Sequence, residues 1–80
     1  MFNVYILISL SSSYYYIGHT VNIVKRLKQH NSGHVRSTKR GIPWILVYKE
    51  ICKTKSEAYK RELLIKSYKG GEAFKRLIKK

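Results

Sequence analysis

The stretch "FNVYILISLSSSYYYIG", residues 2–18, decides how this chain folds. Its first part, residues 2–10, is rich in β-branched and aromatic residues and short for a helix, so it predicts a buried strand. The three serines at 11–13 predict a turn, and "YYYIG" at 14–18 predicts a second strand that ends at Gly18. We therefore expect a β-hairpin that supplies two neighbouring strands of a sheet.

After the hairpin the pattern alternates between helix and strand. Residues 20–30 have a helical period, with an apolar stripe of Ile23, Val24 and Leu27. Residues 33–43 predict a polar, basic loop, and "WILVYKEI" at 44–51 predicts a third strand.

The carboxyl-terminal third predicts two helices. Thr54 followed by Glu57 is a capping box, so a helix should begin there and run to about Tyr68. Gly70-Gly71 ends it, and residues 72–80 predict a short last helix. We expect an α/β fold in one domain, residues 1–80, with a three-stranded, mainly antiparallel sheet flanked by helices in the order β-β-α-β-α-α.

Charge indicates the class of partner. Seventeen Lys and Arg face four acidic residues, a formal net charge of +13, and 44% of residues are apolar, which is enough for a folded core. Such an excess attracts polyanions, so nucleic acid is the expected partner. A merely solubilising basic surface and a ribosomal or membrane-surface role are the alternatives.

Cysteine count and hydropathy exclude several other classes. Cys52 is the single cysteine, which excludes an internal disulfide and a multi-cysteine zinc site. The amino-terminal apolar stretch lacks a basic leader, so we expect no signal peptide, and no segment approaches the ~20 apolar residues of a membrane span. We expect a cytoplasmic protein.

Three polar features are hard to explain as core. Arg26 and His30, four residues apart, share one strip at the shoulder of the first helix, either as a solvated flank or as a functional pair. Tyr5 and Tyr16 lie near the middle of paired strands, where they either pack or expose reactive hydroxyls; Tyr14 and Tyr15 are read as packing residues.

Glu62 is the third feature. A helical projection places it within an apolar stripe formed by Ala58, Tyr59, Leu63 and Ile65. An ionised carboxylate there is costly unless it is paired or binds a cation. Glu62 is therefore either in a salt bridge or a ligand of Mg²⁺, a cation that suits a single hard oxygen because it keeps most of its waters.

In combination, these residues resemble a known family. "VYI" at 4–6 and "YIG" at 16–18, followed by Arg26, "HN" at 30–31 and Glu62, resemble the GIY-YIG endonuclease domain over nearly the whole chain. The phrases "YYIGHT", "RLKQHNSGHVRSTK", "PWILVYKE" and "KTKSEAYKRE" are similar to its small, stand-alone, single-domain bacterial branch. Two positions depart from the family pattern: Val4 replaces the first glycine, and His19 stands where some branches carry lysine.

The resemblance implies a divalent-metal-dependent phosphodiesterase. Glu62 would hold one Mg²⁺ or Mn²⁺ ion, and Arg26 would bind the scissile phosphate. Tyr5 would activate the attacking water and Tyr16 would orient it. The metal and Arg26 would lower the pKa of Tyr5, and His30 would take its proton onward.

The other basic residues would bind the phosphate backbone of the nucleic acid and would not discriminate between base sequences. Asn31 either caps its helix, which we expect, or fixes the geometry of the site.

The substrate would be nucleic acid, and we expect DNA. It would be cut with low sequence selectivity or at an unusual structure, in repair or recombination. The protein would be a monomer or weak dimer without a small-molecule cofactor. The expected nucleic-acid-binding residues are His19, Arg36, Lys39 and Arg40, with His34 in the same basic loop.

Two rival functions stay open from sequence. A binding module could keep the fold and the basic surface without turnover. A ribosome-associated basic protein would explain the charge but not Glu62.

Overall fold

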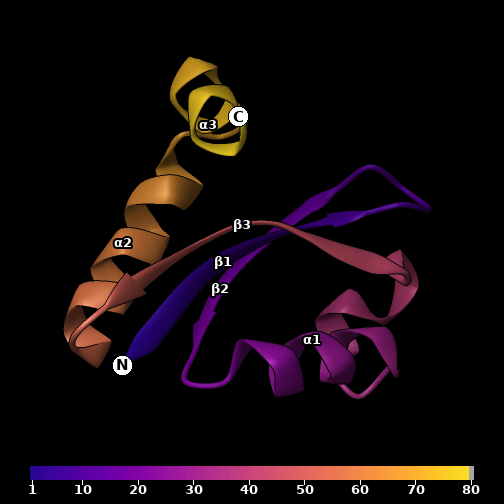
Figure 1. Cartoon of the computed structure of the whole chain (residues 1–80). Coiled ribbons are helices and arrows are strands. Elements are labelled where there is room, and N and C mark those ends of the chain that lie inside the picture. Colours follow the sequence, from indigo (N-terminus) through magenta and orange to yellow (C-terminus); the bar gives the residue numbers. More distant parts are fainter. Residues whose placement is uncertain (80) are drawn as a thin grey trace.

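A computed structural model describes residues 1–79; Lys80, the last residue of the predicted third helix, lies outside the described residues. The sheet has the strand order β2-β1-β3 and both pairs are antiparallel, as predicted. Figure 1 shows α2 on one side of the twisted sheet and α1 on the other. The elements are β1 (Phe2–Ser9), β2 (Tyr15–Thr20), α1 (Ile23–Asn31), the 3₁₀ helix η1 (Arg36–Gly41), β3 (Trp44–Cys52), α2 (Lys55–Ser67) and α3 (Glu72–Ile78).

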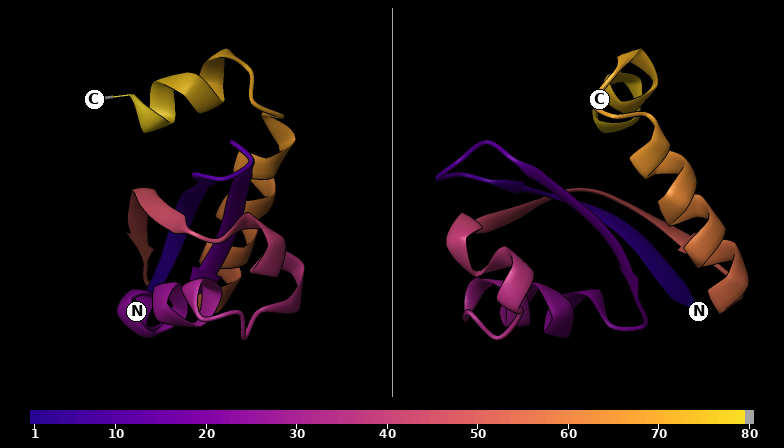
Figure 2. Two further views of the ribbon diagram at one scale, coloured as in Figure 1. Left: turned by 90° about the vertical axis from the view of Figure 1, so that its right-hand side faces the viewer. Right: turned by 180° about the vertical axis from the view of Figure 1, so that it is seen from behind.

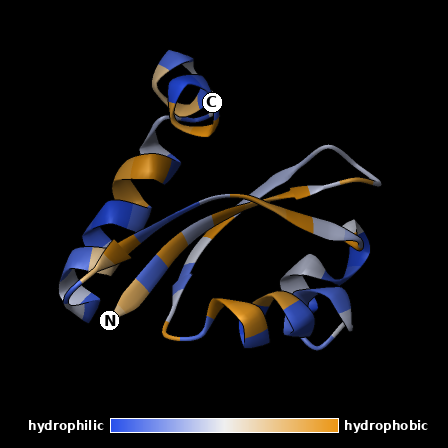
Figure 3. Cartoon of the chain, in the orientation of Figure 1, coloured by the Kyte–Doolittle hydropathy of each residue, from blue (hydrophilic) through white to orange (hydrophobic). Residues whose placement is uncertain are grey.

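β1 is the central strand, and alternate residues face opposite layers. Val4 and Ile6 join the core beneath α2 and α3, whereas Tyr5 and Leu7 join a second core beneath α1. A strand covered on both faces needs apolar residues at successive positions. Figure 3 accordingly shows most of β1 in hydrophobic colours.

The α2 layer forms as its sequence predicts. Thr54 accepts a hydrogen bond from the backbone of Glu57, and the Glu57 side chain accepts one from the backbone of Thr54 in return, a complete capping box. Ala58 and Ile65 are buried against the sheet, and Phe74 of α3 closes the same core. Figure 2 shows α3 crossing over the end of α2.

The α1 layer differs from the prediction in three details. Asn22 caps the helix, so α1 begins at Ile23, after a bend rather than at Thr20. The stretch expected to be a loop contains η1. Val24 is 65% exposed, so the stripe that packs on the sheet consists of Ile23 and Leu27 without it.

The second strand is longer than predicted. β2 continues through Gly18 to Thr20 because Gly18 pairs with Tyr5 in the middle of the hairpin. Gly18 therefore does not end the strand. Its role is a close approach to a side chain, described below.

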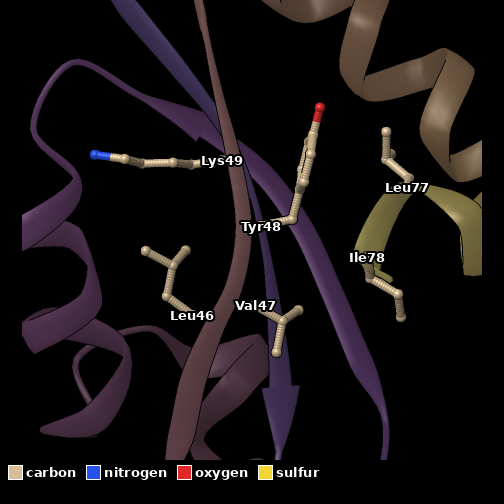
Figure 4. Close-up of a pocket in the computed structure, with 6 residues that line it drawn as sticks. All are labelled: Leu46, Val47, Tyr48, Lys49, Leu77 and Ile78. Atoms are coloured by element: carbon tan, nitrogen blue, oxygen red, sulfur yellow. The ribbon is translucent and has the colours of Figure 1, made fainter. Parts of the chain in front are cut away.

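None of the helices in residues 1–79 combines the length and the apolar character that crossing a bilayer requires. Figure 4 shows one apolar pocket on the sheet, between β3 and α3, lined by side chains that include Val47, Leu77 and Ile78. No predicted site residue lines this pocket.

Candidate active site

A chain of buried hydrogen bonds joins three elements on the α1 side of the sheet. The Tyr5 hydroxyl lies 2.9 Å from Nε2 of His30, and Nδ1 of His30 lies 2.7 Å from Oγ1 of Thr38. All three side chains are almost completely buried. β1, α1 and η1 thus position one continuous Tyr5–His30–Thr38 chain.

The hydrogen-bond network assigns the proton positions in this chain. The Thr38 hydroxyl donates to the carbonyl oxygen of Val35 at 3.3 Å, which leaves its oxygen to accept from Nδ1–H of His30. Nε2 then carries the lone pair and accepts from the Tyr5 hydroxyl. The proton of Tyr5 already points to the predicted acceptor.

Burial shifts both titrating groups of this chain toward their neutral forms. Desolvation and the nearby charge of Arg26 lower the pKa of His30 to about 4, so its Nε2 is free to accept a proton at neutral pH. Burial raises the pKa of Tyr5 to about 12, although Arg26 acts in the opposite direction. Desolvation outweighs the guanidinium when no metal ion is bound, so the lowering of the Tyr5 pKa by Arg26 together with a metal ion stays a prediction.

Arg26 and Tyr16 complete the group around Tyr5. The guanidinium of Arg26 is close enough to influence the pKa of Tyr5 and donates to Oε1 of Gln29 at 3.2 Å. The Tyr16 ring centroid lies 4.8 Å from that of His30 and 6.1 Å from that of Tyr5. Four of the five predicted catalytic residues therefore meet on one face of the sheet.

Gly18 makes room for this arrangement. A Cβ atom at Gly18 would lie 2.9 Å from the Tyr5 hydroxyl oxygen and 3.0 Å from Cε2 of Tyr16. Tyr5 can reach His30 only because its cross-strand partner has no side chain. The glycine of the "YIG" tripeptide is thus a packing requirement of the site.

Glu62 belongs to α2, on the other side of the sheet from α1, and is held by two partners. Its Oε1 accepts from Nδ1 of His19 at 2.6 Å, and its Oε2 accepts from Nζ of Lys66 at 2.6 Å. Its side chain is 12% exposed, whereas Tyr59 is 53% exposed. Glu62 therefore borders the buried stripe of Ala58 and Ile65 rather than lying within a wide apolar face, and the predicted salt bridge is present.

His19 links Glu62 to the catalytic face. A surface hollow between the end of β2 and the start of α1 is lined by both His19 and Arg26. The charge of Glu62 also raises the pKa of Tyr5, so the carboxylate lies within electrostatic reach of the phenol. The structure gives His19 a hydrogen bond that orients Glu62, in addition to the nucleic-acid contact expected from sequence.

Three of the four predicted nucleic-acid-binding residues lie together on η1, and the fourth, His19, is on β2. Arg36, Lys39 and Arg40 are all exposed on this one short helix. They form a cationic surface next to the Tyr5–His30–Thr38 chain, because Thr38 belongs to the same helix.

Sequence reasoning missed Thr38 and misjudged Asn31. Thr38 lies within a basic run, and only the folded chain brings it to His30. The Asn31 side chain does not cap α1; it accepts from the Trp44 backbone N–H at 2.6 Å and donates to the Trp44 carbonyl at 3.0 Å. Asn31 thus ties α1 to β3 and fixes the geometry of the site.

The donor set at Glu62 fits a weakly held hard cation. In residues 1–79 no three His, Cys, Asp or Glu side chains cluster as metal ligands would. One carboxylate oxygen suits Mg²⁺ or Mn²⁺, whose other positions are filled by water and substrate phosphate. Oε2 is the oxygen a cation would take, because its partner Lys66 is 49% exposed and can swing into solvent.

Comparison with known proteins identifies relatives of this chain. The family model of the GIY-YIG catalytic domain matches residues 1–74. The chain is 47% identical over 53 residues to an UPF0213 protein of Desulfotalea psychrophila and 43% identical over 54 residues to one of Staphylococcus haemolyticus. These alignments cover 64% and 66% of this chain, but only 48% and 66% of the two relatives.

A further relative is covered more completely. An UPF0213 protein of Staphylococcus aureus is 41% identical over 63 residues, which are 78% of this chain and 77% of that protein. The comparison with solved structures finds no match. The family model covers most of this chain, residues 1–74 of 80. Together with the "VYI" and "YIG" strands that pair around Tyr5 and Gly18, it shows that this chain belongs to the GIY-YIG catalytic domain family.

Proposed function

We propose that this chain is a divalent-metal-dependent endonuclease that hydrolyses nucleic-acid phosphodiester bonds, DNA in particular, with low sequence selectivity. The buried Tyr5–His30 hydrogen bond beside Arg26 is the observation that carries the proposal. Hydrolysis of a phosphodiester needs a proton acceptor for water and a fixed positive charge for the phosphate, and this arrangement offers both. A role in repair or recombination and a cytoplasmic location belong to the same proposal.

The hydrogen bonds support a concerted transfer of two protons. The attacking water gives a proton to the Tyr5 oxygen while Tyr5 passes its own proton to Nε2 of His30. The water oxygen bonds to phosphorus, the bond from phosphorus to the 3′ oxygen breaks, and the leaving oxygen takes a proton from solvent. Because the two transfers are concerted, no free tyrosinate forms, which suits a phenol whose pKa is about 12.

Substrate binding would improve His30 as an acceptor. The charge of Arg26 is one of the two causes that lower the pKa of His30. A phosphate bound to Arg26 would offset that charge, so the pKa of His30 would rise when substrate is present. The base would then be strongest only in the complex that reacts.

Glu62 would hold one Mg²⁺ or Mn²⁺ ion in place of the Lys66 ammonium. Bound there, the ion would polarise a phosphate oxygen and offset charge on the leaving 3′ oxygen. The hydrogen bond from His19 would keep the carboxylate oriented during this exchange. Tyr16 would orient the water or the phosphate beside Tyr5.

The cationic residues of η1, with His19, would supply affinity for the backbone. Contacts of this kind release counterions, so binding should weaken steeply as salt rises and depend little on sequence. We propose that the protein acts as a monomer or weak dimer.

A cleavage assay with a matched pair of variants tests this proposal. Wild-type protein, Glu62→Ala and Glu72→Ala are incubated with nicked, branched, single-stranded and duplex DNA in Mg²⁺ or Mn²⁺. Glu72 is an exposed acid on α3 and serves as the control for a lost negative charge. We expect Glu62→Ala to lose cleavage while it still binds DNA, and Glu72→Ala to cleave as wild type does.

Two outcomes would contradict the proposal. Cleavage that survives in Glu62→Ala would show that the activity comes from another site or a contaminant. Binding without cleavage by the wild-type protein on every substrate would leave the binding module as the function.

A further inference from the structure

A groove at the start of β2 adjoins the proposed site, and most of its lining has no role in the proposed chemistry. It lies between the β1–β2 turn and η1, at the right-hand side of Figure 1. Its lining includes the aromatic side chains of Tyr14, Tyr16 and Trp44, together with Arg40.

The aromatic residues of the groove differ in what they can offer to a ligand. Tyr14 is 73% exposed, and within residues 1–79 its side chain has no ring partner and no hydrogen bond. Trp44 is 5% exposed and donates its Nε1–H to the Thr38 carbonyl at 2.8 Å. Trp44 therefore forms the floor, and the Tyr14 ring is free to stack on a ligand. Exposure of the Tyr14 ring to water is unfavourable, so the groove favours a ligand with a flat, apolar surface that covers this ring.

Charge selects the class of ligand. Arg40 lines the groove, and Arg36 and Lys39 lie on the same short helix. None of the four acidic residues of the sequence lines it. A ligand with a flat π face and negative charge at regular spacing fits both features, as a nucleotide of a single strand does.

The groove is continuous with the candidate active site. Tyr16 and Thr38 line it, and the same two residues contact His30. Tyr14 and Tyr16 are two residues apart at the entry to β2, about 7 Å along an extended strand. A strand whose phosphate lies at Arg26 can therefore place a neighbouring base in the groove.

We propose that this groove binds an unpaired nucleotide next to the scissile phosphate, with its base on Tyr14 and its phosphate on Arg40. Bases inside a blunt duplex are stacked on one another and do not present a free face to a side chain. The preferred substrate is therefore a strand with an unpaired segment beside the cleaved bond. This inference rests on the proposed nuclease function and specifies its substrate.

Binding without divalent metal tests the groove separately from catalysis. In EDTA, fluorescence anisotropy measures the affinity for labelled dT15, for a blunt hairpin duplex, and for the same hairpin with a dT tail. The variants are Tyr14→Ala, Tyr14→Phe, Arg40→Ala and, as a charge-matched control, Arg76→Ala on the exposed side of α3. The single tryptophan, Trp44, reports on occupancy of the groove through its fluorescence.

Loss of one stacked base should weaken binding about fivefold or more. We expect that loss in Tyr14→Ala for dT15 and the tailed hairpin, no loss for the blunt hairpin, and near-wild-type affinity in Tyr14→Phe. Arg40→Ala should weaken binding of the tailed hairpin more than Arg76→Ala does. Unchanged affinity of Tyr14→Ala for dT15, or an equal loss on the blunt hairpin, would overturn the proposal.

Cleavage of the tailed hairpin in Mg²⁺ separates the two proposals. If wild type cleaves and Tyr14→Ala binds and cleaves equally well, the groove proposal is wrong and the nuclease stands. If no protein cleaves but Tyr14 still controls binding to dT15, the groove stands and the nuclease proposal is wrong.

Discussion

The Tyr5 hydroxyl lies 2.9 Å from Nε2 of His30, although 25 positions separate the two residues in the sequence. This hydrogen bond crosses the α1 core and connects the central strand of the sheet to the helix that carries Arg26. It places a buried phenol and a buried neutral imidazole beside the partly exposed guanidinium of Arg26.

Removal of the Tyr5 hydroxyl should abolish most of the activity. A positioned proton-transfer group contributes about 10²–10⁴-fold to a rate, so Tyr5→Phe should slow single-turnover DNA cleavage by about 100-fold or more. Tyr48→Phe is the matched control, because it removes a hydroxyl bonded to Glu50 that plays no part in the site. A Tyr5→Phe protein that cleaves within a few-fold of the wild-type rate would exclude Tyr5 as the water activator.

A methyl group at Gly18 should displace Tyr5. The new Cβ in Gly18→Ala would lie 2.9 Å from the Tyr5 oxygen. Overpacking of this kind typically costs about 1–3 kcal/mol of unfolding free energy, measured by urea denaturation. In a double-mutant cycle the cost should shrink in the Tyr5→Phe background, because the nearest clashing atom is gone. Equal costs in both backgrounds would show that the glycine serves another purpose.

Stability should fall in mildly acid solution because of His30. Its pKa is about 4 in the folded chain and near 6.5 when unfolded, so between these values the unfolded chain binds more protons. The groups that face His30 are Tyr5, Tyr16, Arg26 and Thr38, and none offers a negative charge that would stabilise the imidazolium.

The contribution of neutral His30 to the free energy of unfolding is therefore fully present above about pH 6.5. It is lost as the pH falls toward 4, by about 3 kcal/mol at most. Urea denaturation of wild type and His30→Gln across this pH window measures the difference. A wild-type loss no larger than that of His30→Gln would show that His30 is not the group responsible.

Lys66 should compete with the metal ion for Glu62. Exposed ion pairs are worth about 0.2–1 kcal/mol, so Lys66→Met should bind Mn²⁺ about 1.5- to 5-fold more tightly in a titration followed by electron paramagnetic resonance. Lys60→Met, another exposed lysine of α2, controls for the loss of a positive charge. Glu62→Gln should bind Mn²⁺ weakly in either background. Equal affinities for wild type and Lys66→Met would place the metal elsewhere.

Local patterns were sufficient for most of the fold. The apolar run of β1, the turn serines and the Thr54–Glu57 capping box act over neighbouring residues, so their structures could be predicted one element at a time. The ordered motifs of the family also predicted that Tyr5, Tyr16, Arg26, His30 and Glu62 would share one concavity. The first four lie close together, whereas Glu62 is held separately on α2 by His19 and Lys66. The loop predicted before β3 contains the 3₁₀ helix η1, which the sequence did not indicate. Contacts of Thr38 and Gly41 with residues elsewhere in the chain hold this helix.

The tertiary structure decided how the site residues are held. Thr38, Asn31 and Gly18 act through contacts with residues 8 to 13 positions away or on a paired strand, and no local pattern identifies such partners. Glu62 was predicted to be either paired or a metal ligand, and folding set its two partners, His19 across the sheet edge and Lys66 one turn away. Residue type and spacing determine which groups can take part in chemistry. Their pKa values and partners depend on burial and on atoms brought together only by the folded chain.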